Sequence, residues 1–383
     1  MKSTSILEIS ESALKNNIDF LQSTLGDSCL LSAVIKGNAY GHGISSYAPL
    51  AAKCGVKHFS VFSASEAFQA KQVLPDQCQI MIMGMVDKTD LLWAIENEIS
   101  FYVFDLSRLF AAIEVAKKNK LKAKIHVELE TGFNRTGFNE NELKEVLECI
   151  KRNSDHLIIE GLCTHYAGAE SISNFVRIQN QITLYHARKK WLTEQGFKAN
   201  TYHTACSAAV INYPETRMDM ARVGIMQYGF WSNKETYVSF VNRHNLKSDP
   251  LQRVISWKSS VMNIQQIKSG EFIGYGSTYF AERDMDIAVV PVGYSHGYSR
   301  SLSNQGRVLI NGHRLGVVGL VNMNMLVVDI THAPETKVGD EVVLIGRQGE
   351  HTLSVSSFSE MSDQLNYELL TRLPQDITRI ITK

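Results

Sequence analysis

The residue of this sequence best placed to do chemistry is Lys36, which comes directly after a short apolar run. Residues 29–35 have the composition of a buried strand, and a small glycine-rich turn over residues 37–43 follows the lysine. Because the loops after parallel strands converge on one crevice in α/β proteins, an amine at this place can meet a substrate. The alternative is a structural lysine, whose stem covers apolar surface while its amine reaches water. Other residues must decide between the two.

A second group of ionisable residues lies in the run 123–130, where apolar and polar residues alternate. The alternation puts His126, Glu128 and Glu130 on one face of a predicted strand. In a barrel that face would point into the interior, where unpaired charges are costly. Arg135, in the loop that follows, is the nearest candidate for a counter-charge. A purely structural ion pair is the alternative.

Two further strand ends bring polar groups to the same rim, and the eighth predicted strand adds an arginine. His165 follows one predicted strand, and Ser207 opens a helix after another, where its hydroxyl and the neighbouring backbone N–H groups can bind a phosphate. Arg222 stands in an apolar strand and cannot lose its proton, so it must find an acceptor, and Gly224 leaves room for a ligand near the backbone. A satisfied core histidine and an ordinary N-cap serine are the structural alternatives. Together, lysine, arginine, histidine and a phosphate site suggest pyridoxal 5′-phosphate, held as a Schiff base by the lysine.

The elements that must position these residues alternate between strands and helices. After a short strand at 6–9 and a helical run at 11–25, strand-like runs occur at residues 29–35, 58–62, 79–83, 99–104, 123–130, 157–164, 201–206 and 221–228. Helical stretches lie between most of them, such as 65–73, 89–97, 106–119, 140–152 and 174–195. Eight such units in about 230 residues favour a (β/α)₈ TIM-type barrel, with an open doubly wound sheet as the main alternative. No GxGxxG motif follows an early strand.

The pattern changes near Trp231. Beyond it, short runs rich in Val and Ile alternate with glycine-containing turns, and only residues 356–370 have a helical rhythm. We therefore predict a cofactor-binding barrel over residues 1–235 and a mostly β domain over residues 236–383, with residues 1–10 as candidates to pair with the β domain. The runs assigned to the β domain are 254–267, 286–292, 306–310, 315–330 and 341–345.

Composition narrows the class of partner. The chain has 383 residues, and its 39 lysines and arginines balance 39 aspartates and glutamates, so no net charge attracts nucleic acid or an anionic membrane. The six cysteines are scattered without a CxxC pair, which is typical of reduced thiols in the cytoplasm, and no apolar run is long enough to span a bilayer. We predict a cytoplasmic protein with a small-molecule substrate, without nucleic-acid or membrane partners and without a metal site.

The ordered set of motifs resembles the alanine racemase family over the whole chain. Residues 33–43 are similar to the pyridoxal-binding signature of that family, and the likeness continues through residues 130–137, 164–167, 222–225, 274–276, 293–294 and 366–368. The resemblance implies a pyridoxal-phosphate-dependent amino-acid racemase that works as a head-to-tail homodimer with shared active sites.

By that resemblance, each site residue receives a role. Lys36 would hold the cofactor and act as the base on one face of the substrate, and Tyr275, supplied by the partner subunit, would act on the other face. Arg222, supported by His165, would face the pyridine nitrogen. The residues that would bind the phosphate are Tyr40, Ser207, Gly224, Ile225 and Tyr367, and those that would bind the substrate are Arg135 and Met323. An unperturbed phenol, with a pKa of about 10, is a weak base, so Tyr275 would need positive charge nearby.

The sequence departs from the family pattern at several positions. Glu128 stands where the family usually has a lysine, which in many members is carbamylated and orients the following arginine, and we expect the Glu128 carboxylate to replace the carbamate. The other departures are Cys206, His296, Leu320 and Asn324, where asparagine, aspartate, arginine and aspartate are common. They are either neutral changes or signs of an altered entry corridor and of a substrate other than alanine.

The predicted activity is racemisation of L- and D-alanine, with D-alanine supplied to peptidoglycan. The first alternative is a racemase for serine, lysine or another amino acid on the same scaffold. Decarboxylases that share the barrel are disfavoured, because their cysteine-containing motif is not evident here. A non-catalytic pyridoxal-phosphate carrier would resemble the barrel alone, whereas this chain also has the predicted β domain with Tyr275.

Overall fold

The structure, a computed structural model, divides into two compact units. It describes residues 3–355 and 366–383, and of Asn366 and Tyr367 it describes the backbone alone. The barrel unit comprises Ala13–Lys36 and Ala48–Gln252. The β unit comprises the residues before Ala13, the segment Gly37–Tyr47 and the residues from Arg253 onward. The β unit therefore begins later along the chain than the predicted boundary after residue 235, and it includes the turn that follows Lys36.

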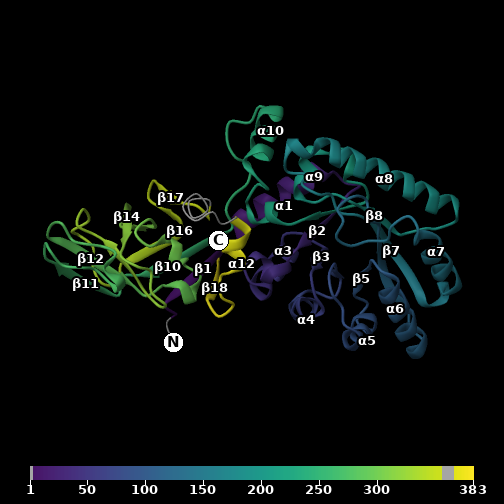
Figure 1. Ribbon diagram of the computed structural model, residues 1–383, viewed down its shortest axis with the longest axis horizontal. Coiled ribbons are helices and arrows are strands. Elements are labelled where there is room, and N and C mark those ends of the chain that lie inside the picture. Colours follow the sequence, from purple (N-terminus) through teal and green to yellow (C-terminus); the bar gives the residue numbers. More distant parts are fainter. Residues whose placement is uncertain (1–2, 356–365) are drawn as a thin grey trace. The chain divides into compact units, whose positions relative to one another are not determined.

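Within the described residues, the barrel unit holds a sheet of eight parallel strands (Figure 1). Their order is β8, β7, β6, β5, β4, β3, β2 and β9, and the bridge between Cys206 and Arg222 joins the segment after β8 to β9, which closes the ring. The strands are β2 (Leu30–Val34), β3 (His58–Val61), β4 (Gln79–Ile82), β5 (Ser100–Val103), β6 (Ala123–Glu128), β7 (Leu157–Cys163), β8 (Thr201–His203) and β9 (Met220–Val223). The predicted (β/α)₈ barrel is confirmed.

Helices cover the outside of these strands, as Figure 1 shows for α4 to α8. Most of them bury one apolar face, whereas α9 is buried on all sides. Side-chain caps fix where several begin: the Ser63 hydroxyl at α4 and the Asp105 carboxylate at α6 each accept a backbone N–H of the first turn. The helices are α1 (Glu11–Leu25), α3 (Ile44–Lys53), α4 (Ala64–Val73), α5 (Lys88–Glu96), α6 (Leu106–Asn119), α7 (Leu143–Arg152), α8 (Phe175–Glu194), α9 (Ser207–Asn212) and α10 (Lys234–His244).

One predicted strand, 221–228, is too long. The strand β9 ends at Val223, because Gly224 takes φ −100° and ψ −100°, outside the strand region, and a 3₁₀ turn, η4 (Ile225–Tyr228), follows. The change matters for the site, since it places the backbone N–H groups of Gly224 and Ile225 at the start of a helical turn instead of in a sheet ladder.

In the part of the chain that is described, the β unit holds one ten-stranded sheet. The first strand of the chain, β1, pairs with β10 and with β18, while the predicted run 254–267 is two strands, β10 and β11, because the chain changes partner from β16 to β12 at Val261 and Met262. The strands are β1 (Ser5–Ser10), β10 (Ile255–Ser260), β11 (Asn263–Ile267), β12 (Met285–Val290), β13 (Arg307–Ile310), β14 (His313–Val318), β15 (Leu326–Asp329), β16 (Glu341–Gln348), β17 (His351–Leu353) and β18 (Thr378–Thr382). Most of the predicted helical stretch 356–370 lies outside the described residues, and α12 (Asn366–Thr371) covers its end.

None of the six cysteines forms a disulfide. Burial raises the pKa of the Cys163 thiol, which faces the barrel interior. In the described residues, no helix combines the length and the apolar character that a membrane span requires.

The turn over residues 37–43 has an unusual backbone. The φ angles of residues 37–40 all lie between 50° and 62°, so four consecutive residues are left-handed. This conformation costs a non-glycine residue about 1–2 kcal/mol. Backbone bonds hold it: the Gly41 N–H donates to the Gly37 carbonyl at 3.0 Å and the Gly43 N–H to that of Asn38 at 2.8 Å. The sequence predicted only a small flexible turn, whereas the structure shows a strained and hydrogen-bonded one, which is typical of functional loops.

Gly41 occupies a place in this turn where no side chain fits, which gives a test of the fold. Its φ is +80°, and a Cβ there would lie 1.9 Å from the Leu370 carbonyl oxygen. Gly312, in the β13–β14 hairpin, has a φ of +79°, but nothing lies within 4 Å of its would-be Cβ. We predict that Gly312→Ala lowers the free energy of unfolding by about 1 kcal/mol and Gly41→Ala by about 3 kcal/mol or more. Equal losses in urea-induced unfolding would contradict this account of the turn.

Candidate active site

Lys36 follows β2 at the C-terminal end of the barrel strands. Its side chain reaches solvent on one side, while the barrel rim encloses the other. This enclosure lowers the pKa of the Lys36 amine, and the positive charges of Arg135 and Arg222 lower it further. A lowered pKa leaves more of the amine neutral near pH 7, and the neutral amine is the form that attacks a carbonyl. A lysine that only covers apolar surface would need none of these features.

Arg222, on β9, is 4% exposed, and hydrogen bonds to neighbouring strand ends fix its guanidinium. Its Nη1 donates to His203 Nδ1 at 2.5 Å and to the His203 carbonyl at 2.9 Å, and its Nη2 donates to the carbonyls of Thr164 at 2.8 Å and Thr204 at 3.2 Å. These bonds use four of the five guanidinium N–H groups, and the Nε–H has no partner among the described residues. An acceptor on a ligand would therefore bind at Nε.

The histidine that bonds to Arg222 is His203, which sequence reasoning did not single out. The expected supporter, His165, makes no hydrogen bond to Arg222 in the described structure, and its ring instead packs 5.6 Å from that of Phe133, centroid to centroid. Burial lowers the pKa of His165 to about 3, helped by the charges of Arg222, Arg135 and Lys36, so its ring stays neutral. The signal for His203 was present, because strand parity puts it on the same face as Thr201 and Ala205, inside a barrel.

The predicted phosphate-binding residues of the barrel unit lie together. The Gly224 N–H donates to the Ser207 hydroxyl at 2.9 Å, and Ile225 begins η4 directly after Gly224. The starts of α9 and η4 therefore meet, and backbone N–H groups at helix starts attract anions. Tyr40 belongs to the left-handed turn of the β unit and is buried, and the side chain of Tyr367 lies outside the described residues.

Glu128 is buried at 4% exposure and points into the barrel, as its strand parity predicted. Burial raises the pKa of its carboxyl group, while a hydrogen bond from the Thr136 hydroxyl and the charges of Arg222 and Arg135 oppose the rise. The Arg135 guanidinium lies 4.1 Å from the centroid of the Phe133 ring, in a cation–π contact. Within the described residues, Arg135 forms no ion pair with Glu128, so its influence on Glu128 acts through space.

The counter-charge expected for Glu130 is not needed. The Glu130 carboxylate accepts the backbone N–H groups of Gly132, Asn134 and Arg135, in the last two cases at 2.9 Å and 3.4 Å. A carboxylate that accepts several backbone N–H groups is stabilised without a cation. Arg135 was the nearest candidate counter-charge for the inward face as a whole, and at Glu130 the loop supplies main-chain N–H groups instead.

The remaining predicted site residues belong to the β unit and are exposed there. Tyr275 begins the 3₁₀ turn η5 (Tyr275–Ser277) with 73% of its surface exposed, and Met323 is 56% exposed. Among the departures from the family pattern, Leu320 borders the same turn, since a Cβ at Gly276 would lie 3.4 Å from its Cδ1. His296 Nδ1 accepts the Gly293 N–H at 3.1 Å, and the Asn324 side chain donates to Ser295 Oγ at 3.0 Å.

In the barrel unit, the arrangement suits one kind of chemistry. A reactive amine, a fixed cation with one N–H to offer and a pair of helix starts can hold an aldehyde that also carries a ring nitrogen and an anionic group. Among the described residues, no group of three His, Cys, Asp or Glu side chains lies close enough together to hold a metal ion.

Comparison with known proteins places the whole chain in one group. Residues 9–231 match the model of the alanine racemase N-terminal domain, and residues 254–381 match the model of the alanine racemase C-terminal domain. The alanine racemase of Leptospira interrogans is 32% identical to this chain, in a match that covers 100% of the chain and 97% of that protein.

Solved structures agree with the sequence comparison. The structure of alanine racemase from Bacillus anthracis with bound L-Ala-P superposes with a TM-score of 0.91 at 28% identity, covering 100% of this chain and 96% of that one. The structure of alanine racemase from Bartonella henselae with covalently bound pyridoxal phosphate superposes with a TM-score of 0.84 at 25% identity, covering 100% of both chains.

The buried histidines of the barrel predict how acid affects stability. Burial lowers the pKa of His58 to about 4, and the pKa values of His126, His165 and His203 are lowered too. In the unfolded chain a histidine has a pKa of about 6.5, so below that pH the unfolded state binds protons that the fold excludes, and stability falls.

We therefore predict that His58→Gln flattens the pH dependence of the free energy of unfolding by about 1.4 kcal/mol per pH unit between about pH 6 and 4.5. The exposed His186→Gln should leave the slope unchanged. Urea-induced unfolding at a series of pH values measures both. An unchanged slope in His58→Gln would show that this histidine is protonated in the fold.

Proposed function

The chain belongs to the alanine racemase family, and we propose that it is a pyridoxal-phosphate-dependent enzyme that interconverts L- and D-alanine. The observation that carries this proposal is that Lys36, Arg222 and the hydrogen-bonded pair Ser207–Gly224 all lie at the C-terminal ends of the barrel strands. The family match covers both units and thus includes Tyr275. In a bacterial cytoplasm, the D-alanine formed would feed peptidoglycan synthesis.

The residues present fit the cofactor. Its aldehyde suits the neutral amine of Lys36, its phosphate suits the starts of α9 and η4, and its pyridine nitrogen, an acceptor, suits the Arg222 Nε–H. The Bartonella henselae relative binds pyridoxal phosphate covalently, which supports the same arrangement here. When bound, the cofactor withdraws electrons from the substrate Cα and makes its proton removable.

Racemisation requires the Cα proton to leave one face and another to return on the opposite face. The neutral Lys36 amine can accept the proton on its own face, because its pKa is lowered. We assign the other face to Tyr275 of a second subunit. Its 73% exposure within one chain supports this assignment, since a base supplied to a partner must project from its own unit. Arg222 donates a hydrogen bond but keeps its proton, so it orients the ring nitrogen without protonating it.

The substrate carboxylate needs a cation, and Arg135 is the residue we assign to it. The Phe133 ring supports the Arg135 guanidinium from one side. We infer that Glu128 acts as the fixed negative charge that keeps this guanidinium in place, the role that a carbamylated lysine has in many family members. We also assign Met323 to substrate binding.

Another amino acid is the second candidate substrate. The observation that favours it is the uncharged Leu320 beside the Tyr275 turn, together with His296, which accepts the Gly293 N–H, and Asn324, which donates to Ser295. Fewer fixed charges around the entry would admit a larger or less polar side chain.

The direct test is racemisation of each of the twenty amino acids by the purified protein with pyridoxal 5′-phosphate, followed by solvent-deuterium exchange at Cα. We predict that alanine is the best substrate. Lys36→Ala should lose racemisation and exchange, by at least about 100-fold. Tyr275→Phe should lose racemisation to the same extent but keep exchange for one enantiomer, because one base remains. Absence of exchange in the wild-type protein would identify a carrier and overturn the proposal.

Glu128→Gln tests the proposed anchor of Arg135. The amide still accepts the Thr136 hydroxyl but carries no charge, so we expect KM for the substrate to rise about tenfold with a smaller change in kcat. Because burial raises the pKa of Glu128, kcat/KM of the wild type should fall as the pH drops through that raised value, and the variant should lack this acid limb. A variant with the wild-type KM and pH profile would remove Glu128 from the site.

A further inference from the structure

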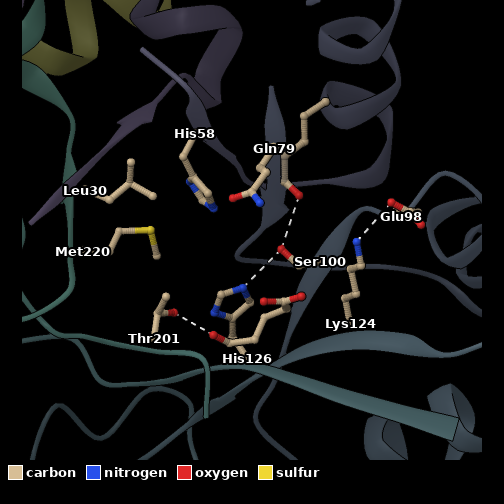
Figure 2. A pocket seen from close by; sticks show the side chains of 11 residues that line it. Leu30, His58, Gln79, Glu98, Ser100, Lys124, His126, Thr201 and Met220 are labelled. Carbon is tan, nitrogen blue, oxygen red and sulfur yellow. Dashed lines mark hydrogen bonds and ion pairs between the residues drawn. The ribbon is translucent and has the colours of Figure 1, made fainter. Parts of the chain in front are cut away.

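A chain of buried hydrogen bonds runs from Arg222 away from Lys36, toward the N-terminal ends of the barrel strands. Beyond His203, the next link joins His203 Nε2 to His126 Nδ1 at 2.8 Å. His126 Nε2 then contacts Ser100 Oγ at 3.1 Å, and this hydroxyl donates to the Ile80 carbonyl at 3.3 Å. Figure 2 shows the last two links, with Ser100 between the His126 ring and the neighbouring strand.

The two ends of this chain fix its direction. An arginine can only donate, so His203 Nδ1 must accept from Arg222, which leaves the proton of a neutral His203 on Nε2. His203 then donates to His126 Nδ1, and His126 donates through Nε2 to Ser100. At the far end, the Ile80 carbonyl can only accept. Every link therefore points away from Arg222, and both histidines are neutral Nε2–H tautomers.

A glycine, Gly161, makes room for the rings of His126 and His203. Gly161, on β7, lies opposite His126, and a Cβ there would lie 2.1 Å from His126 Nδ1 and 2.7 Å from His203 Nε2. The register of β6 against β7 shifts between Ile125 and His126, which brings Gly161 to this place. The contact between the two histidines thus depends on the strand register and on the absence of a side chain at Gly161.

The chain ends beside a small cavity at the N-terminal ends of the strands. The cavity has a volume of about 50 Å³, and Ser100, His126 and His58 line it with polar and apolar residues of the other strands (Figure 2). Lys36 and Arg222 are not among its lining residues, so it is separate from the candidate active site. It leaves space beside Ser100 for an added methyl group.

We propose that Ser100 and His126 are positioning residues for Arg222, because their hydrogen bonds fix the tautomer of His203 and so hold the guanidinium with its Nε–H facing the cofactor site. The proposal rests on the proposed function for the identity of that cofactor. Without the Ser100 hydroxyl, His126 has no acceptor for its Nε2–H. A proton on Nδ1 of His126 would then force His203 to carry its proton on Nδ1, against a donor of Arg222.

The pair Ser100→Thr and Ser100→Val tests this inference. Both variants add the same bulk, for which the cavity has space, and they differ only in the hydroxyl. Ser60→Ala is the control, because Ser60 is fully buried in the same barrel and bonds to Ser32, outside the chain from Arg222. If Ser100→Val fails to fold, Ser100→Ala removes the hydroxyl without adding bulk and gives the same comparison.

Two measurements decide the outcome. Long-range ¹H–¹⁵N NMR of histidine-labelled protein reports each tautomer, and fluorescence titration gives the Kd for pyridoxal 5′-phosphate. We expect Nε2–H tautomers for His126 and His203 in the wild type, in Ser100→Thr and in Ser60→Ala. In Ser100→Val we expect mixed tautomers and a Kd raised about fivefold, the effect of one ordinary hydrogen bond.

Three results would overturn the inference: an Nδ1–H or charged His203 in the wild type, wild-type tautomers in Ser100→Val, or altered tautomers with an unchanged Kd. Neither readout uses catalysis. A protein that binds pyridoxal 5′-phosphate with these tautomers but racemises no amino acid would therefore refute the proposed function and leave the positioning role standing.

Discussion

The permanent charge of Arg222 sits inside the barrel, where only hydrogen bonds can stabilise it. Four of its N–H groups donate to the backbone carbonyls of Thr164, His203 and Thr204 and to the His203 ring. These partners come from the ends of β7 and β8, whereas Arg222 lies on β9, so the guanidinium is only satisfied when the barrel closes at the Cys206–Arg222 bridge. Closure of the barrel therefore also fixes the orientation of the remaining guanidinium N–H, at Nε.

The same charge shapes the reactivity of its neighbours. It helps to lower the pKa of the Lys36 amine and that of His165, after burial, which is the larger cause for both. Because the pKa of Lys36 is lowered and the His165 ring is neutral, Lys36 is the group at the barrel mouth best suited to accept a proton. The left-handed turn after Lys36 adds rigidity, since its backbone hydrogen bonds and the lack of space at Gly41 restrict the chain directly beyond the amine.

Much of this was predictable from the sequence, because it depends on periodicity. The alternation in residues 123–130 placed His126 and Glu128 inside the barrel, and the eight strand-like runs gave the architecture. The hydrogen-bond partners of the site residues were harder to predict from the sequence. His203 was missed in favour of His165, since strand parity alone does not tell which of two inward histidines reaches an arginine on another strand. The backbone amides that satisfy Glu130, the left-handed run after Lys36 and the early end of β9 depend on local dihedral angles that residue types only loosely restrict.

The most direct test of the central claim is a crystal structure of the protein loaded with pyridoxal 5′-phosphate. The claim is that Arg222 is held so that only its Nε–H is offered to the cofactor. It predicts a covalent link to Lys36 Nζ and a distance of about 2.7–3.2 Å between Arg222 Nε and the pyridine nitrogen, with Nη1 and Nη2 still bonded to His203, Thr164 and Thr204. A pyridine nitrogen bound to Nη1 or Nη2, or a cofactor seated away from Arg222, would contradict it.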